Sequence, residues 1–215
     1  MSRDYAGTAP KALRGGLASS CRPSIVPVPR LPRLQVAGGV YHVTSRGNRR
    51  QTVFHDDTDY SAFLEYLETV VRQYSWRCHG YCLMPNHFHL LIETPEPNIS
   101  EGMQRLNSRY AQWFNRRHGY SGHLFQGRFY GRLVESAYHL LELARYVVAN
   151  PVRAGLCSHA GEWKWSSYRA VVGDVKRATF LTVGWLLDQF GRDPQQARET
   201  FRQFVRDASA RPRAP

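Results

Sequence analysis

The sequence predicts an α+β fold, a ferredoxin-like or RRM-like split β-α-β sheet with helices, an extra helix and a C-terminal helical extension. Strand-like and helix-like segments alternate in the order β-α-β-β-α-β-α. The chain has 215 residues and is 42% apolar, which is enough for a sizeable core. No run approaches the roughly eighteen apolar residues of a membrane span, so we expect none.

The first half of the chain supplies three strands and one helix. Three segments with β-branched, aromatic or apolar runs predict strands: 40–46, 77–83 and 87–93. Pro85-Asn86 separates the last two and predicts a hairpin. Between the first two strands, apolar residues recur at helical spacing as far as about Tyr74, and Asp56 or Asp57 can cap this helix.

The second half continues the alternation. A helix starts at Asn98 or Ser100 and stops near Gly119, and residues 128–134 form the fourth strand. Ser136 caps a third helix, which we expect to end before Pro151, at Asn150 or slightly earlier, because proline disrupts a helix interior. Two more helical stretches follow: 183–190 and 194–206.

Composition divides the chain into three parts. Residues 1–30 carry Gly, Pro, Ser and Arg without periodicity, which predicts a disordered basic tail. Residues 31–155 contain the alternating elements and form the main domain, and residues 156–215 form a helical extension packed on it. We expect Trp163 and Trp165 to attach this extension to the domain.

Charge indicates a polyanionic partner. Lys and Arg number 29 against 17 Asp and Glu, a formal net charge of +12. Nucleic acid is the commonest polyanion for such a chain, although acidic membranes or partner proteins also attract basic proteins. Nearly all the cations are arginines, which bind phosphate through two hydrogen bonds at once; a GC-rich coding bias gives the same composition.

The cysteines predict a reducing compartment. The chain has Cys21, Cys78, Cys82 and Cys157 without a CxxC pair, so we expect reduced thiols and no zinc knuckle. Cys78 and Cys82 lie in one apolar strand and are candidate core residues. The N-terminus lacks a compact apolar segment of the secretory type, so we expect no secretory signal.

Two histidines stand two residues apart in the third strand. Side chains alternate between the faces of a strand, so His87 and His89 project together while Phe88 points into the opposite layer. Two imidazoles about 7 Å apart can hold one metal ion. A chance pair of strand histidines is the alternative.

The third helix carries a tyrosine outside its apolar face. At 100° per residue, Asn150 lies one turn beyond Tyr146, and both lie away from the apolar stripe. An ordinary solvated face is the alternative. Tyr110, in contrast, lies in the middle of an apolar stripe and is expected in the core.

Several motifs carry a resemblance to a known family. Pro85-Asn86-His87-Phe88-His89 is similar to an HUH (His-hydrophobic-His) motif, and residues 145–155 are similar to a catalytic-tyrosine helix. Both features occur in single-tyrosine transposases of the insertion-sequence type. Three further stretches resemble the branch called REP-associated tyrosine transposases: 41–49, 122–128 and 163–168. The resemblance covers about residues 31–170.

This resemblance implies an activity and residue roles. The family cuts single-stranded DNA near a hairpin and joins the 5′ phosphate to a tyrosine, assisted by a divalent ion. Carried onto this sequence, Tyr146 is the catalytic nucleophile, and His87 and His89 are metal ligands. Asn150 takes the third, amide-type ligand position, where many relatives have Gln. Mixed N/O ligation suits Mn²⁺, and Mg²⁺ is the more available ion.

Arginines in several places are expected to bind the DNA. Arg105, Arg109 and Arg116 form a stripe on the second helix, which a plain solvated face also explains. The other candidates lie near the first and fourth strands: Arg46, Arg49, Arg50, Arg128 and Arg132. Four aromatics nearby can stack on unpaired bases or pack in the core: Tyr120, Phe125, Phe129 and Tyr130.

Two other functions fit parts of this pattern. A hairpin-DNA or RNA binder on the same layer needs no nucleophile, although RRM domains use aromatic sheet residues where this chain has histidines. A metallophosphoesterase would use water in place of tyrosine and needs more carboxylate ligands. We expect a transposase that is a monomer or homodimer, nucleoid-associated in a bacterial cytoplasm, with no membrane partner and no small-molecule cofactor.

Overall fold

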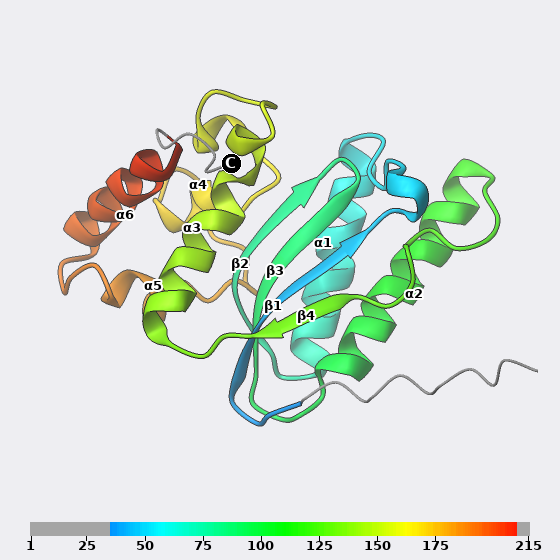
Figure 1. The fold of residues 1–215 in the computed structure, drawn as a ribbon, viewed down its shortest axis with the longest axis horizontal. Coiled ribbons are helices and arrows are strands. Elements are labelled where there is room, and N and C mark those ends of the chain that lie inside the picture. The colour runs from blue at the N-terminus through cyan, green and yellow to red at the C-terminus, as the bar shows by residue number, and fades with distance from the viewer. Residues whose placement is uncertain (1–34, 210–215) are drawn as a thin grey trace, which may run out of the picture. The chain divides into compact units, whose positions relative to one another are not determined.

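A four-stranded antiparallel sheet organises the computed structural model, which describes residues 35–209 (Figure 1). The strands lie in the order β2-β3-β1-β4. Their bounds are β1 (Gly39–Arg46), β2 (Arg77–Met84), β3 (His87–Thr94) and β4 (Tyr130–Leu133). β1 and β2 are separated by antiparallel β3, which confirms the predicted split β-α-β sheet and the β2–β3 hairpin. The tail predicted for residues 1–30 lies outside the described residues.

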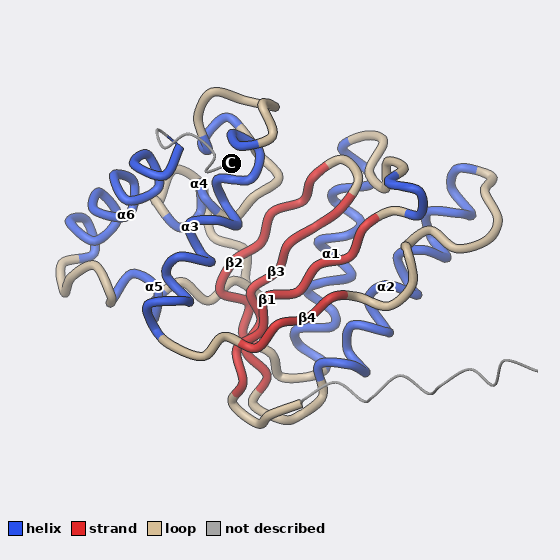
Figure 2. Tube along the Cα trace, viewed as in Figure 1, coloured by secondary structure: helices blue, strands red, loops and turns tan. Residues whose placement is uncertain are grey.

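Helices cover both faces of the sheet (Figures 1 and 2). α1 (Asp57–Gln73) and α2 (Ile99–His118) pack on one face, and α3 (Ala137–Arg153) packs on the other, against β2 and β3. α6 (Pro194–Ser209) packs on α3. The remaining helices are short: η1 (Asn48–Arg50), η2 (Ala160–Glu162), α4 (Tyr168–Val171) and α5 (Gly184–Asp188). Among the described helices, none is long and apolar enough to cross a membrane.

The helix ends follow their capping residues. The Asp56 side chain accepts hydrogen bonds from the backbone N–H groups of Thr58 and Asp59 and so starts α1, one of the two predicted starts. Ser136 accepts from the N–H of His139 and starts α3 as predicted. Gly119 ends α2 with a φ of 68°, a conformation that glycine adopts without steric cost.

The expected end of the third helix is wrong. α3 continues through Pro151 to Arg153. Pro151 has no N–H to donate to the carbonyl of Val147, but the Asn150 amide donates to the carbonyls of Tyr146 and Val147, at 2.9 and 3.4 Å. The side chain before the proline therefore replaces the missing backbone hydrogen bond and lets the last turn form.

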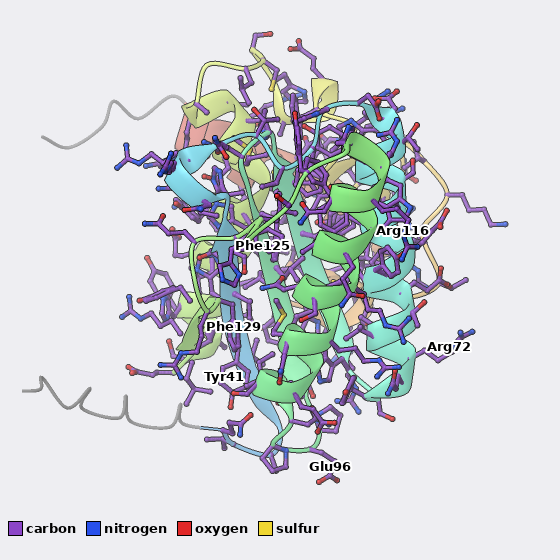
Figure 3. All side chains as sticks on the ribbon, turned by 90° about the vertical axis from the view of Figure 1, so that its right-hand side faces the viewer. Tyr41, Arg72, Glu96, Arg116, Phe125 and Phe129 are labelled. Atoms are coloured by element: carbon purple, nitrogen blue, oxygen red, sulfur yellow. The ribbon has the colours of Figure 1, made fainter. Side chains whose placement is uncertain are left out.

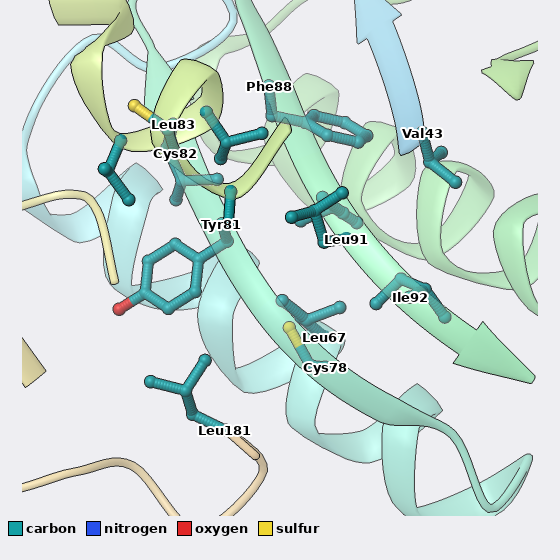
Figure 4. Packing of buried hydrophobic residues seen from close by; sticks show 14 of the residues in the cluster. Val43, Leu67, Cys78, Tyr81, Cys82, Leu83, Phe88, Leu91, Ile92 and Leu181 are labelled. Carbon is teal, nitrogen blue, oxygen red and sulfur yellow. The ribbon is translucent and has the colours of Figure 1, made fainter. Parts of the chain in front are cut away.

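The main core lies between the sheet and the α1–α2 layer. Phe63 of α1 packs on Phe88 of β3 with ring centroids 4.6 Å apart, and Tyr110 of α2 packs on Phe63. The Tyr110 hydroxyl donates to the Val53 carbonyl at 2.5 Å, which confirms this tyrosine as a core residue. Cys78 and Cys82 of β2 are buried free thiols, also as predicted (Figure 4).

Tryptophans attach the C-terminal extension to the hairpin. The Trp163 indole N–H donates to the Leu83 carbonyl at 3.0 Å, and the Leu83 N–H donates to the Trp165 carbonyl at 2.9 Å. The Trp165 ring stacks on Tyr60 of α1 with centroids 4.6 Å apart. Both tryptophans therefore have the structural role that the sequence predicts.

Candidate active site

The side-chain alternation of β3 builds one wall of the site. His87, His89 and Glu93 share the face of the sheet that α3 covers, and Phe88 points into the opposite core. On β1, Thr44 pairs with His89, and His42 lies one pleat further along the same face. Three imidazoles therefore gather on one side of the two central strands.

The phenol of α3 meets these histidines within one chain. The Tyr146 ring lies edge-on to His89, with centroids 5.6 Å apart, and edge-on to His42, with centroids 6.0 Å apart. The His87 and His89 rings are 4.9 Å apart. The fold thus brings together His87, His89 and Tyr146, although Tyr146 lies 57 positions after His89 in the sequence.

In each of the two predicted ligands, His87 and His89, one ring nitrogen has a hydrogen-bond partner and the other does not have one among the described residues. His89 Nδ1 lies 3.0 Å from His42 Nε2, and these two rings stack. His89 Nε2 is buried and has no hydrogen-bond partner among the described residues. His87 Nδ1 contacts Asn86 Oδ1 at 2.7 Å, which leaves its Nε2 available. An orphaned imidazole nitrogen beside a second available one fits a divalent metal ion.

Burial keeps these imidazoles neutral. It lowers the pKa of His87 to about 4, and the nearby Arg46 charge adds to the effect. It lowers the pKa of His42 to about 4 as well, with the charges of His139 and Arg132 contributing. Burial also holds the pKa of His89 well below its ordinary value. A neutral imidazole has the lone pair that a metal requires.

Asn150 lies near Tyr146 but is used within its helix. Its side chain is buried, and its amide nitrogen donates to the Tyr146 and Val147 carbonyls. Within residues 35–209, the hydrogen bonds do not link it to His87 or His89. Its place as a third ligand remains a prediction, and its geometric role is to complete α3.

Two further residues border the reacting groups and were not predicted as site residues. His42 contacts both His89 and Tyr146, and the only sequence signal was its position in the strand stretch 41–49. The Arg153 guanidinium carbon lies 5.5 Å from the centroid of the Tyr146 ring. Arg153 is seven residues from Tyr146, two helical turns, so the helical wheel could have identified it.

The predicted DNA-binding arginines separate into two groups. Arg46 and Arg128 line a cavity of about 290 Å³ with His87, His89 and Tyr130. Arg132 lies opposite His42 in the β1–β4 register, and Arg49 and Arg50 lie in η1 beyond the end of β1. Of these arginines, Arg46, Arg128 and Arg132 lie beside the histidines.

The arginine stripe lies elsewhere. Arg105 and Arg109 line a separate hollow of about 300 Å³ on α2, and Arg116 lies further along that helix (Figure 3). α2 covers the face of the sheet opposite α3, so the stripe is not brought to the histidines. Among the four candidate stacking aromatics, Phe125 and Phe129 are buried, whereas Tyr120 and Tyr130 are exposed.

A second cluster could also hold a divalent metal. Potential ligand atoms of His55, Asp59 and His118 lie within 4.8 Å of one another, between the start of α1 and the end of α2. Asp59 is fully buried and already contacts the His55 N–H at 2.7 Å, the His118 ring at 3.0 Å and the Arg117 guanidinium. Because Asp59 is paired with the Arg117 guanidinium and bonded to the His118 ring, the cluster works as a polar centre that joins α1 to α2.

We expect Asp59→Asn to destabilise the fold by about 3 kcal/mol, because it leaves the Arg117 guanidinium beside an uncharged, buried group. The measurement is thermal unfolding, with an expected decrease of roughly 6–12 °C in Tm. Asp57→Asn is the matched control, since the Asp57 carboxylate is 68% exposed and pairs with surface Lys164. Equal melting temperatures of the two variants would contradict the assigned role of Asp59.

Comparisons with known proteins point to one family. A Haemophilus influenzae protein that carries the name REP-associated tyrosine transposase is 24% identical over 143 residues. The match covers 58% of this chain and 80% of that protein. The solved structure of a REP-associated tyrosine transposase bound to a REP hairpin has the same fold. Its TM-score is 0.59 at 19% identity, over 72% of this chain and 92% of that one. The family described as "Transposase IS200 like" matches residues 35–150, more than half of the sequence, and the chain therefore belongs to the IS200-like transposase family.

Proposed function

We propose that this chain cleaves and rejoins single-stranded DNA near hairpin sequences through a covalent 5′-phosphotyrosine on Tyr146. The observation that carries the proposal is the 5.6 Å separation of the Tyr146 and His89 rings within one chain. A hairpin is the DNA bound in the structurally similar transposase. With chromosomal DNA as substrate, we place the protein at the nucleoid of a bacterial cytoplasm.

The covalent step exchanges one phosphoester for another. The Tyr146 oxygen forms a bond to phosphorus and its proton passes to solvent; the bond from phosphorus to the 3′ oxygen breaks, and that oxygen takes up a proton. The products are a 5′-phosphotyrosine and a free 3′-OH. Because a phosphodiester bond persists on the protein, a 3′-OH can reverse the step and rejoin strands.

The histidines and the surrounding arginines prepare this reaction. His87 and His89 would hold Mg²⁺ or Mn²⁺ through their Nε2 atoms, with the Asn150 amide oxygen as the third protein ligand. When bound, such an ion offsets the phosphate charge and stabilises the transition state. His42 fixes the ring of His89 through the 3.0 Å contact at Nδ1. Because the Tyr146 ring lies beside His89 of the same chain, we expect one protomer to be sufficient for cleavage.

A denaturing gel tests the proposal. Wild-type protein incubated with single-stranded hairpin DNA and Mn²⁺ should give a covalent protein–DNA band. EDTA added before the DNA should prevent this band from forming. The substrates are palindromic repeats taken from the host genome. Tight, salt-sensitive binding without any covalent band across these substrates would contradict cleavage and favour the alternative of a non-cleaving hairpin binder.

We expect Arg128→Gln to weaken binding of single-stranded DNA of any sequence and to reduce the salt slope of the affinity by about 1, because one phosphate contact is lost. Arg128 is exposed and lines the cavity beside His87. Anisotropy titrations at several salt concentrations measure the slope. Arg72→Gln is the matched control, since Arg72 is exposed on α1 in the opposite layer (Figure 3). An unchanged slope for Arg128→Gln would remove this cavity from the proposed DNA path.

A further inference from the structure

A second cavity opens on the same face of the sheet as the histidines. It measures about 450 Å³ and lies between the strands β1 to β3, the start of α3 and α5. Three apolar side chains and three polar ones define its chemistry: Val40, Leu140 and Trp185, and Arg77, His79 and Glu93. Apolar walls with a few converging polar groups are typical of small-ligand sites.

The polar groups are held in place and one of them lacks a partner. Glu93 accepts from Arg77 Nη1 at 2.5 Å and contacts His79 Nε2 at 2.9 Å. The His79 side chain is only 4% exposed, and its Nδ1 is buried without a hydrogen-bond partner among the described residues. Glu93 is 18% exposed and has further acceptor capacity. A ligand with an N–H group at its edge can therefore donate to Glu93.

Charge and shape select the class of ligand. Two carboxylates line the cavity, Glu93 and Glu135, which disfavours a phosphate; the arginine-lined cavity around Arg46 and Arg128 fits phosphate instead. The Trp185 ring is half-buried, 5.8 Å from the His79 ring, and offers an aromatic surface. A flat, uncharged molecule that stacks on tryptophan and donates to a carboxylate satisfies all of these features.

We infer that this cavity binds one unpaired nucleobase carrying an exocyclic amino group, from a nucleotide close to the cleaved phosphate. Glu93 is four residues beyond His89 on the same strand face, about 13 Å along β3. A strand whose phosphate lies at Tyr146 can therefore place a neighbouring base between Trp185 and Glu93. The inference rests on the proposed function, because it assigns a base-specific subsite to the same DNA.

The test is a base scan of DNA bound to the full-length wild-type protein in EDTA, measured by fluorescence anisotropy. The probe is a hairpin with a single-stranded oligothymidine extension, in which each thymine in turn becomes adenine, cytosine, guanine or an abasic site. We expect one position at which an amino base raises affinity about tenfold and an abasic site removes the gain, as expected for one stacked base. These changes are in the DNA and leave the protein fold intact.

Protein variants locate that position. In the Trp185→Ala variant, the choice of base at the sensitive position should change DNA affinity less than about twofold. Trp113→Ala, on α2 in the opposite layer, should keep the tenfold preference. Glu93→Gln should lose the preference for amino bases, and exposed Glu96→Gln should keep it. Uniform binding at every position, or a preference that survives Trp185→Ala, would overturn the inference.

The covalent-adduct assay separates the two proposals. A covalent adduct with base-independent binding would refute the base pocket alone. Base-selective binding through Trp185 without an adduct would refute cleavage and leave the pocket standing. Absence of any DNA binding would refute both.

Discussion

Tyr146→Phe is expected to reduce the covalent adduct at least about a thousandfold, to the limit of detection, because phenylalanine has no oxygen to bond to phosphorus. The ring remains, so its edge contacts with His42 and His89 should persist. Hairpin-DNA affinity should stay within about twofold of wild type, since no phosphate-binding arginine changes. A denaturing gel with labelled single-stranded DNA measures the adduct, and anisotropy measures the affinity.

Tyr138→Phe is the matched control for this variant. Tyr138 lies on the same helix, is 75% exposed, and should form the adduct at the wild-type rate after its hydroxyl is removed. Undiminished adduct in Tyr146→Phe would assign the nucleophile to another residue. Equal loss in both tyrosine variants would instead indicate damage to α3.

His89→Ala is expected to produce the second largest effect, a loss of roughly a hundredfold or more in both Mn²⁺ affinity and cleavage rate. The physical reason is that it removes both the buried Nε2, which lacks a partner among residues 35–209, and the anchor of the His42 ring. Isothermal titration with Mn²⁺ measures the affinity without DNA. His87→Ala should act in the same direction, because it removes the Nε2 atom opposite the Asn86 contact.

The matched control is His123→Ala, since His123 is exposed in the loop before β4. This control should bind Mn²⁺ and cleave as wild type does. Unchanged Mn²⁺ affinity in His89→Ala would place the ion elsewhere, and the cluster of His55, Asp59 and His118 would become the site to test by the same titration.

The local elements could be predicted because their signals are local. Asp56, Ser136 and Gly119 cap helices through atoms two to four residues away, so their positions in the sequence determine the helix ends. The end of α3 could not be predicted from Pro151 alone, since it depends on how the Asn150 amide turns back to the Tyr146 and Val147 carbonyls.

The site could be predicted only in part, for a related reason. Strand alternation places His87 and His89 on one face, but the approach of Tyr146 depends on how α3 packs across β2 and β3. The contact between His42 and His89 depends on the register of two strands that are distant in sequence. The helical wheel of α2 groups Arg105 with Arg109 correctly, yet cannot tell which face of the sheet that helix covers.

Peptide mapping of the adduct gives the most direct test of the nucleophile. After reaction with single-stranded hairpin DNA, nuclease trimming and trypsin digestion, mass spectrometry should find a 5′-phosphonucleotide on the peptide 146–153, which contains one tyrosine. A nucleotide on any other peptide, or a cleaved DNA strand with no modified peptide, would contradict the assignment of Tyr146.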